Sequence, residues 1–317
     1  MKSLTALAVS VLALTLPASA YEWTEEKGKF VDLRNGDQLL VRYVYEAIDT
    51  SSDEERTRTY KPFLHVHSPT GGFLTKGPGG KFTHHRGIFF GFSKNKYVDS
   101  AGKTHGPFDT WHCKNGAYQL HKKFISKTAN EDGAEISVEI DWFGNGAEPF
   151  ATETRTMSFS QSATGDLIVD FASSLKPLHP KAFVDGDPQH AGFHFRAHND
   201  VQAKNAKQTY YIRPKTGKAE MGKTINWNKV DTPETSDLPW KGMSFVLAEK
   251  RYTVAYLDHP ENPKPARFSE RDYGRFGSYF VKEYSPEQPL KVKYRLVIRD
   301  GEMTAEEIAE ASSEFVK

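Results

Sequence analysis

The chain has 317 residues, 42 Lys and Arg against 41 Asp and Glu, one cysteine and 13% aromatic residues. This length predicts one large domain or two small ones. The balanced charge argues against nucleic acid and against an anionic membrane surface as partners, because both need a basic excess. One cysteine excludes an intrachain disulfide and a structural zinc site built on cysteines. The 21 Phe, 14 Tyr and 5 Trp can supply a large buried core.

The first twenty residues have the features of a secretory signal peptide. Lys2 provides a positive start, residues 4–16 are apolar, and Ala18 and Ala20 form a small-x-small cleavage signal. The apolar stretch is shorter than the roughly 20 residues that a membrane helix needs. We therefore expect cleavage near Ala20, a periplasmic or secreted mature chain that begins at Tyr21, and no membrane span.

Alternating apolar residues and turn clusters predict a mature chain built mostly of short strands. Asn35-Gly36 between two extended runs is typical of a hairpin. Residues 136–140 alternate between apolar and polar, as a half-buried strand requires. The predicted strands cover residues 29–33, 38–45, 135–143, 152–160, 167–174, 192–198, 243–247, 252–257, 279–284 and 290–298.

One helix is predicted, at the end of the chain. Thr304 and Glu307 form a capping box, which satisfies backbone N–H groups at a helix start, and the helix is expected over residues 305–315. Many short strands followed by a late helix indicate an all-β fold, a large antiparallel β-sandwich with one C-terminal helix. No linker divides the sequence, so we expect a single domain over residues 21–317.

The twelve histidines are grouped along the chain rather than scattered. Imidazole titrates near neutral pH and binds metals, so a group of histidines suits acid–base chemistry or a metal site. The groups are His65 with His67, His84 with His85, His105 with His112 and His121, and His190 with His194 and His198; His179 and His259 stand apart.

The segment His84-His85-Arg86 is one candidate for a functional site. It follows a loop rich in Gly and Pro and precedes an apolar run, a position that can present polar groups to a cleft. Adjacent residues of an extended chain point to opposite faces, so only one of the two histidines is expected to face a given site.

A second candidate is the segment over residues 190–196. If it is extended, one face carries His190, Gly192, His194 and Arg196, and the opposite face carries two phenylalanines. The alternative is a solvated strand face with an aromatic core behind it.

A third candidate is the loop after the predicted strand over residues 252–257. It places Asp258, His259 and Asn262 close together in a loop stiffened by prolines, with Arg271 a little further on. Trp111 adds an aromatic surface of the kind on which a sugar ring stacks. The alternatives are a structural turn and a buried core tryptophan.

Short motifs in a fixed order resemble the secreted bacterial PmoA-like family, which carries the label "methane oxygenase PmoA". The resemblance covers roughly residues 30–300 and implies a galactose-mutarotase-like β-supersandwich, a fold shared by many carbohydrate-active proteins. The sequence departs from the family pattern at residues 81–83 and 268–271, where members of the family tend to have additional histidines. The motifs lie at residues 59–65, 84–87, 109–112, 153–155, 190–196 and 258–274.

These patterns favour an enzyme outside the cytoplasm that acts on a sugar or glycoside, with a small-molecule or oligosaccharide substrate. His84, His85 and His190 are the candidate acids and bases, with Glu153 or Asp258 as the partner carboxylate. Hydrolysis, elimination and epimerisation all remain open as the reaction.

The remaining candidate residues are assigned to substrate binding. Arg86, Arg196 and Arg271 would hold hydroxyl groups or an acidic group. Trp111 would stack on the ring, with His259 and Asn262 as further polar contacts. No cofactor and no metal are expected. The alternatives are a non-catalytic sugar-binding module and a metalloenzyme with histidine ligands, including an oxygen-dependent one.

Overall fold

The computed structural model describes residues 20–225 and 235–317. The predicted signal peptide lies outside this range except for Ala20. Within the described residues, no helix has the length and apolar character needed to cross a bilayer.

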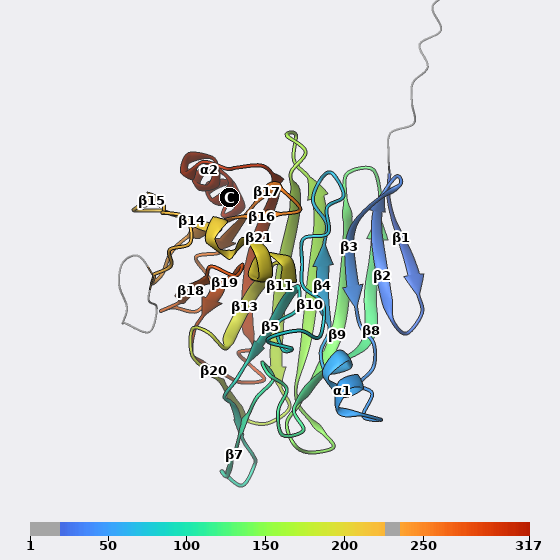
Figure 1. Ribbon diagram of the computed structural model, residues 1–317. Coiled ribbons are helices and arrows are strands. Elements are labelled where there is room, and N and C mark those ends of the chain that lie inside the picture. The colour runs from blue at the N-terminus through green and yellow to red at the C-terminus, as the bar shows by residue number, and fades with distance from the viewer. Residues whose placement is uncertain (1–19, 226–234) are drawn as a thin grey trace, which may run out of the picture.

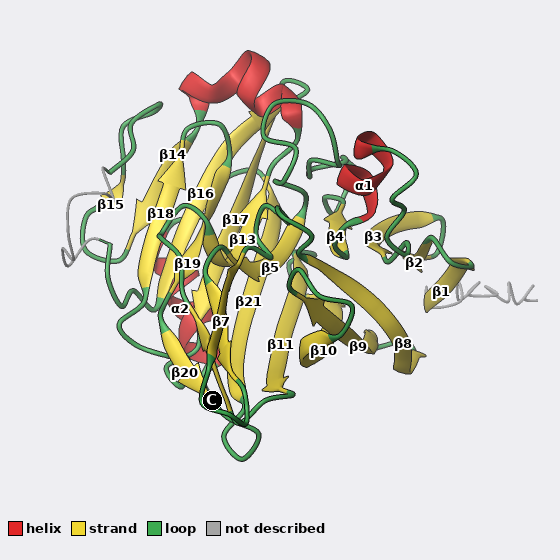
Figure 2. Cartoon of the chain, turned by 90° about the horizontal axis from the view of Figure 1, so that it is seen from below, coloured by secondary structure: helices red, strands yellow, loops and turns green. Residues whose placement is uncertain are grey.

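Two large antiparallel sheets lie face to face, and a small third sheet extends from one end (Figures 1 and 2). The eight-stranded sheet has the order β1 (Tyr21–Glu26), β2 (Phe30–Asn35), β3 (Gln38–Val44), β4 (Phe63–Val66), β5 (Ile88–Phe92), β13 (Ala191–Arg196), β19 (Arg275–Tyr279), β18 (Arg267–Arg271). The nine-stranded sheet has the order β15 (Gly217–Lys218), β14 (Tyr210–Arg213), β16 (Trp240–Leu247), β17 (Lys250–Asp258), β21 (Leu290–Asp300), β11 (Leu167–Pro177), β10 (Pro149–Gln161), β9 (Ala134–Phe143), β8 (Tyr118–Ala129). The four-stranded sheet has the order β20 (Lys282–Tyr284), β12 (Lys181–Val184), β6 (Asn95–Val98), β7 (Thr104–Phe108).

The predicted all-β sandwich with a C-terminal helix is confirmed. The helix α2 (Ala305–Phe315) begins with the capping box of Thr304 and Glu307. Its Ile308 packs with residues of β16 and β17, so α2 covers the side of the nine-stranded sheet that faces away from its partner sheet (Figure 1).

Two predictions of individual elements were wrong. The predicted strand over residues 279–284 is divided between the end of β19 and the short β20. A helix that was not predicted, α1 (Asp53–Thr59), lies between β3 and β4. Its start is stabilised by the Ser52 side chain, which accepts a hydrogen bond from the backbone N–H of Glu55.

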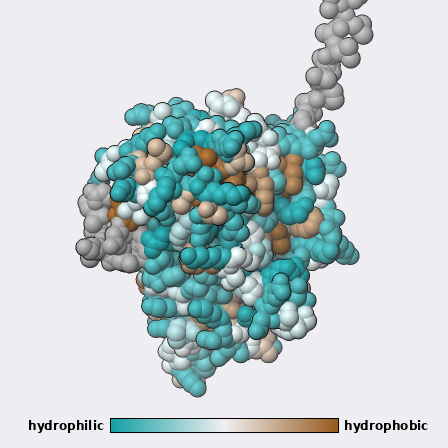
Figure 3. Space-filling view, viewed as in Figure 1, coloured by the Kyte–Doolittle hydropathy of each residue, from teal (hydrophilic) through white to brown (hydrophobic). Residues whose placement is uncertain are grey.

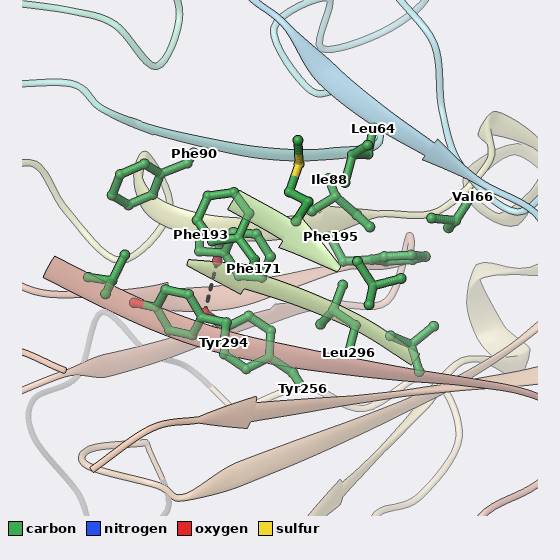
Figure 4. Packing of buried hydrophobic residues seen from close by; sticks show 14 of the residues in the cluster. Leu64, Val66, Ile88, Phe90, Phe171, Phe193, Phe195, Tyr256, Tyr294 and Leu296 are labelled. Carbon is green, nitrogen blue, oxygen red and sulfur yellow. Dashed lines mark hydrogen bonds between the residues drawn. The ribbon is translucent and has the colours of Figure 1, made fainter. Parts of the chain in front are cut away.

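The main core fills the space between the two large sheets (Figure 4). Aromatic rings dominate it: the ring of Phe193 on β13 lies 4.4 Å from Phe171 on β11 and 4.7 Å from Tyr294 on β21, centroid to centroid. The hydroxyl of Tyr256 donates a 3.2 Å hydrogen bond to the carbonyl of Phe193. Burial of these aromatic rings explains why the surface seen in Figure 3 is mostly hydrophilic, with only small hydrophobic patches.

Strand β13 separates this core from a polar interior on the opposite face of the eight-stranded sheet. Phe193 and Phe195 belong to the main core, whereas His194 and Arg196 alternate with them and are equally buried. The predicted division of residues 190–196 into an aromatic and a polar face is confirmed. We call the polar side, which is turned away from the nine-stranded sheet, the outer face.

Candidate functional site

Three histidines from separate loops converge over the outer face of the eight-stranded sheet. His84 precedes β5, His112 follows β7, and His190 precedes β13. One ring nitrogen of each lies within 4.8 Å of those of the other two. Ring centroids are 4.4 Å apart for His84 and His112, 4.8 Å for His112 and His190, and 6.2 Å for His84 and His190. We call these three residues the histidine triad.

Two members of the triad are oriented by carboxylates in the same way. Nδ1 of His112 lies 2.7 Å from Oδ2 of Asp109, and Nδ1 of His190 lies 3.1 Å from both carboxylate oxygens of Asp187. Each aspartate precedes its histidine by three residues and also accepts backbone N–H bonds within its own turn. Nε2 of both rings is left without a hydrogen-bond partner in the described part of the chain, and Nε2 of His84 is buried and unpartnered as well.

The protonation state of the site follows from these contacts. Burial tends to raise the pKa of Asp109 and of Asp187, but hydrogen bonds from the paired histidines hold both pKa values below the ordinary range. Each ionised carboxylate favours the tautomer with the proton on Nδ1 and the lone pair on Nε2. Burial, followed by the nearby His112, lowers the pKa of His84, so its ring is neutral. Where His112 and His190 are neutral, the tautomer protonated on Nδ1 presents the lone pair of each ring on Nε2, the nitrogen away from its carboxylate.

The loops that carry the triad are fixed by their turns. Gly87 has φ +43°, and a Cβ atom there would lie 1.9 Å from the carbonyl oxygen of Leu64, so the chain after His84 can approach β4 only with glycine. Phe82, two residues before His84, has φ +60°, which is a strained conformation for a bulky residue. Its ring stacks on Tyr273 at 5.4 Å beside the triad.

Trp111 and His194 form the floor below the triad. Their ring centroids are 4.6 Å apart, and the Trp111 ring is 6.4 Å from His190. Trp111 is fully buried, so it has no face free for a sugar ring, and the predicted stacking role does not match its position. Phe82 and Tyr273, which are half-buried, are the aromatic rings accessible beside the triad.

The structure brings together the predicted acid–base histidines but places the predicted carboxylates elsewhere. The ring of His85 lies 4.2 Å from that of His84 and is almost completely buried. Glu153 lies on β10, where it pairs with Arg155 and accepts a 2.8 Å hydrogen bond from Nε1 of Trp142. This correction has a simple cause: Glu153 and Arg155 are two residues apart on one strand and share its core-facing side.

Asp258 belongs to a different part of the molecule. It ends β17, binds Nδ2 of Asn262 at 2.7 Å, and lines a hollow of about 420 Å³ next to α2. Burial raises its pKa to about 6. The His259 ring packs against Phe315 of α2 at 5.4 Å, and Asn262 also bridges to the backbone of Lys293. These three predicted site residues thus stabilise the turn beside α2.

The predicted substrate-binding arginines differ in their surroundings. Arg86 and Arg196 are fully buried and bind backbone carbonyls, so they hold loops in place rather than face solvent. Arg271 is half-buried, and its Nη2 donates a 2.6 Å hydrogen bond to the side chain of Gln189, which precedes His190. Arg86 is linked to the triad in the same way, since its Nη2 donates a 3.1 Å hydrogen bond to the carbonyl of Thr83, which precedes His84.

The sequence analysis did not select His112, Asp109 or Asp187 as site residues. A signal for them was present: Asp109 to His112 and Asp187 to His190 repeat the same Asp-x-x-His spacing. In both cases the aspartate closes a turn with its side chain, which brings its second oxygen to the histidine ring.

Such an arrangement can hold a metal ion. Zinc takes imidazole nitrogens at about 2.0–2.1 Å in a tetrahedral arrangement, so two nitrogens on one ion lie roughly 3.4 Å apart. The triad nitrogens lie within 4.8 Å of one another, so the rings would move inward on binding wherever their spacing exceeds the tetrahedral one. Carboxylates behind ligating histidines are the usual second layer of such sites. Three histidines would leave a fourth position open for water or substrate.

Comparison with known proteins identifies the family. Residues 30–313 match DUF6807, a family of unknown function. The chain belongs to DUF6807. No curated protein matches the sequence.

Similar solved structures include a GalM/aldose epimerase homologue from C. elegans, with 7% sequence identity and a TM-score of 0.39 over 90% of this chain and 100% of that chain. They also include the Slr1438 protein of Synechocystis sp. PCC 6803, with 9% identity and a TM-score of 0.41 over 92% of this chain and 100% of that chain. Neither the family description nor these likenesses assigns an activity to this member of DUF6807.

Proposed function

We propose that this DUF6807 protein is a metal-dependent enzyme that acts on a sugar or glycoside, with His84, His112 and His190 as metal ligands. The observation that carries the proposal is the convergence of three ring nitrogens within 4.8 Å. Asp109 and Asp187 behind two of the rings support it, because they set the tautomer that presents Nε2.

The chemistry available at this site is metal-assisted. A bound ion would polarise a substrate oxygen or lower the pKa of a water in its open position. His85 is the candidate proton donor or acceptor, because its ring lies 4.2 Å from His84 and its Nδ1 has no hydrogen-bond partner. Asp109 and Asp187 would keep the rings of His112 and His190 in place during the reaction.

The sugar part of the proposal rests on the aromatic rings beside the triad. Phe82 and Tyr273 offer half-buried aromatic rings beside the triad, on which the C–H face of a sugar can stack. The resemblance to the secreted PmoA-like family implies the same substrate class. The strained backbone of Phe82 also favours a functional loop at this position. The signal-peptide features of residues 1–20 support an enzyme of the periplasm or the cell exterior.

The experiment is a product assay on a panel of sugars and glycosides, with zinc-loaded protein and with protein treated with a chelator. We expect product only from the metal-loaded protein, and none from His84→Ala or His190→Ala. Binding without product would favour the sugar-binding module instead. Turnover that survives full removal of metal would favour acid–base chemistry by the histidines alone and would contradict the metal proposal.

A further inference from the structure

The outer face of the eight-stranded sheet holds buried basic side chains that form no ion pair with a carboxylate. Among residues 20–225 and 235–317, five basic side chains that are at most 2% exposed make hydrogen bonds only to neutral acceptors. The five are Lys61, Lys76, Arg86, Arg196 and Arg275. Burial lowers the pKa of Lys61 and of Lys76 to about 7, whereas the three arginines stay charged because a guanidinium is not deprotonated in proteins. An isolated buried charge is costly, so this group of basic side chains requires an explanation.

Buried cations on the core side of the molecule are treated differently. Arg155 pairs with Glu153, and both Arg213 and Lys241 pair with Glu270. The fold therefore supplies ion-pair partners for these buried cations, whereas the carboxylates next to the triad, Asp109 and Asp187, bond to histidines instead.

Three of the unpaired cations are attached to the triad through its sequence neighbours. Lys61 donates a hydrogen bond to the carbonyl of Trp111, which precedes His112. Lys76 donates at 2.9 Å to the carbonyl of His85, which follows His84, and Arg275 donates at 3.1 Å to the carbonyl of Gln189, which precedes His190. Each triad loop thus has a buried cation behind it.

Arg275 is the clearest example of a buried basic side chain without a carboxylate partner. Its Nη1 is held by His194 Nδ1 at 3.1 Å, by Ser269 Oγ and by the Gln189 carbonyl, whereas Nη2 is buried without any partner. Charges in a low-dielectric interior act over longer distances than surface charges and are screened less by salt. Their field reaches the half-exposed triad in front of them.

We propose that the triad site selects a sugar that carries an oxyanion group, either a carboxylate or a phosphate. The proposal rests on the function proposed above and specifies its substrate class. The oxyanion would occupy the open side of the triad, where the field of Arg275, and of Lys61 and Lys76 in their charged forms, adds to the attraction of the metal. A neutral sugar of the same size would gain only the metal contact and the aromatic contacts.

The test is calorimetric titration of the zinc-loaded full chain with galactose, galacturonate and galactose 6-phosphate. We expect at least one of the acidic sugars to bind about tenfold or more tightly than galactose, and the tighter of the two identifies the oxyanion. Because a metal alone also prefers anions, Lys61→Met and Arg275→Met are the decisive variants, and each should reduce that preference by about threefold or more. Arg34→Met is the control, since Arg34 also binds only a neutral acceptor, on the distant strand β2.

Each result has a definite meaning. Lys61→Met is expected to fold, because it removes an unpaired buried charge and keeps the alkyl chain. Equal affinity for all three sugars, no binding of any of them, or an unchanged preference in both variants would overturn the proposal. Zinc uptake is measured first: a chain that takes up no zinc contradicts the metal centre, and the same titrations on the metal-free chain then still test the oxyanion preference.

Discussion

Two groups of three histidines in this protein differ in what their ring nitrogens meet. The second histidine group, His65, His67 and His198, surrounds the half-exposed ring of Phe73 at centroid distances of 4.8, 5.1 and 5.8 Å. Nδ1 of His65 meets the Thr75 hydroxyl at 2.9 Å, and the other two rings contact backbone groups of their own loops. In the triad, by contrast, the outer nitrogens of two rings meet carboxylates and the inner nitrogens converge.

The comparison teaches that the number of histidines in a group does not identify a metal site. The second histidine group has aromatic and hydroxyl partners, which suit neutral imidazoles that pack as part of the fold. The triad has the partners that keep lone pairs directed at one point. We therefore expect variants of the triad to change metal binding, and variants of the second histidine group to change stability in acid.

Among the variants considered, His112→Ala is expected to have the largest effect, a loss of bound zinc. Loss of one ligand should reduce bound zinc from about one ion per chain to less than about 0.1 after dialysis, because two imidazoles form a much weaker site. His198→Ala, in the second histidine group, should keep the full zinc content. Metal analysis of both variants, with circular dichroism to confirm folding, tests this. Equal zinc content in the two variants would remove the distinction between the groups.

A smaller effect is expected from the carboxylates behind the triad. Asp109→Asn and Asp187→Asn retain a side-chain oxygen for the backbone N–H bonds but lose the charge that fixes the histidine tautomer. Zinc affinity should fall about 10- to 100-fold in each.

Asp99→Asn is the matched control for these two variants. Asp99 holds Nε2 of His105 at 2.7 Å, yet that pair is not part of the triad. Competition with a chromophoric zinc chelator measures all three affinities. If Asp99→Asn weakens zinc binding as much as Asp109→Asn does, the change reflects the charge of the whole protein and not the triad.

The smallest effect concerns stability in acid and tests the structural role of the second histidine group. Burial lowers the pKa of His65 to about 3, so the unfolded chain binds a proton at this residue more readily than the folded chain does. The stabilising contribution is complete above about pH 6.5 and is lost as the pH falls toward 3, at about 1.4 kcal/mol per pKa unit.

His65→Gln should therefore flatten the fall of the free energy of unfolding between about pH 6.5 and pH 3. Urea unfolding at a series of pH values gives the slope for each protein. His67 provides a comparison at the more exposed end of the same group, where a smaller change is expected. Identical slopes for wild type and His65→Gln would mean that His65 is not buried as the structure has it.

The sequence was sufficient for those features that depend on local periodicity. The alternation of Phe193 and Phe195 with His194 and Arg196 correctly predicted both faces of β13, and the capping box of Thr304 correctly predicted α2. The helix α1 was missed because only seven residues form it, although Ser52 and the acidic first turn were visible as signals.

The site was predictable only in part, because it depends on contacts between loops far apart in the chain. His84 and His190 were selected from their local patterns, but periodicity does not indicate that the loop of His112 folds against them. Nor could it distinguish the buried Glu153, whose partner is two residues away, from a carboxylate in a site. The repeated Asp-x-x-His spacing was the one local signal that pointed to His112 and His190 together.

The most direct test of the metal centre is titration of cobalt(II) into the metal-free full chain, followed by visible absorption. We expect a saturable spectrum of tetrahedral or five-coordinate cobalt at about one equivalent per chain. Zinc should displace it, and the triple variant His84→Ala, His112→Ala, His190→Ala should lose it. Failure of the wild-type chain to bind cobalt saturably, or an unchanged spectrum in the triple variant, would contradict the proposed metal centre.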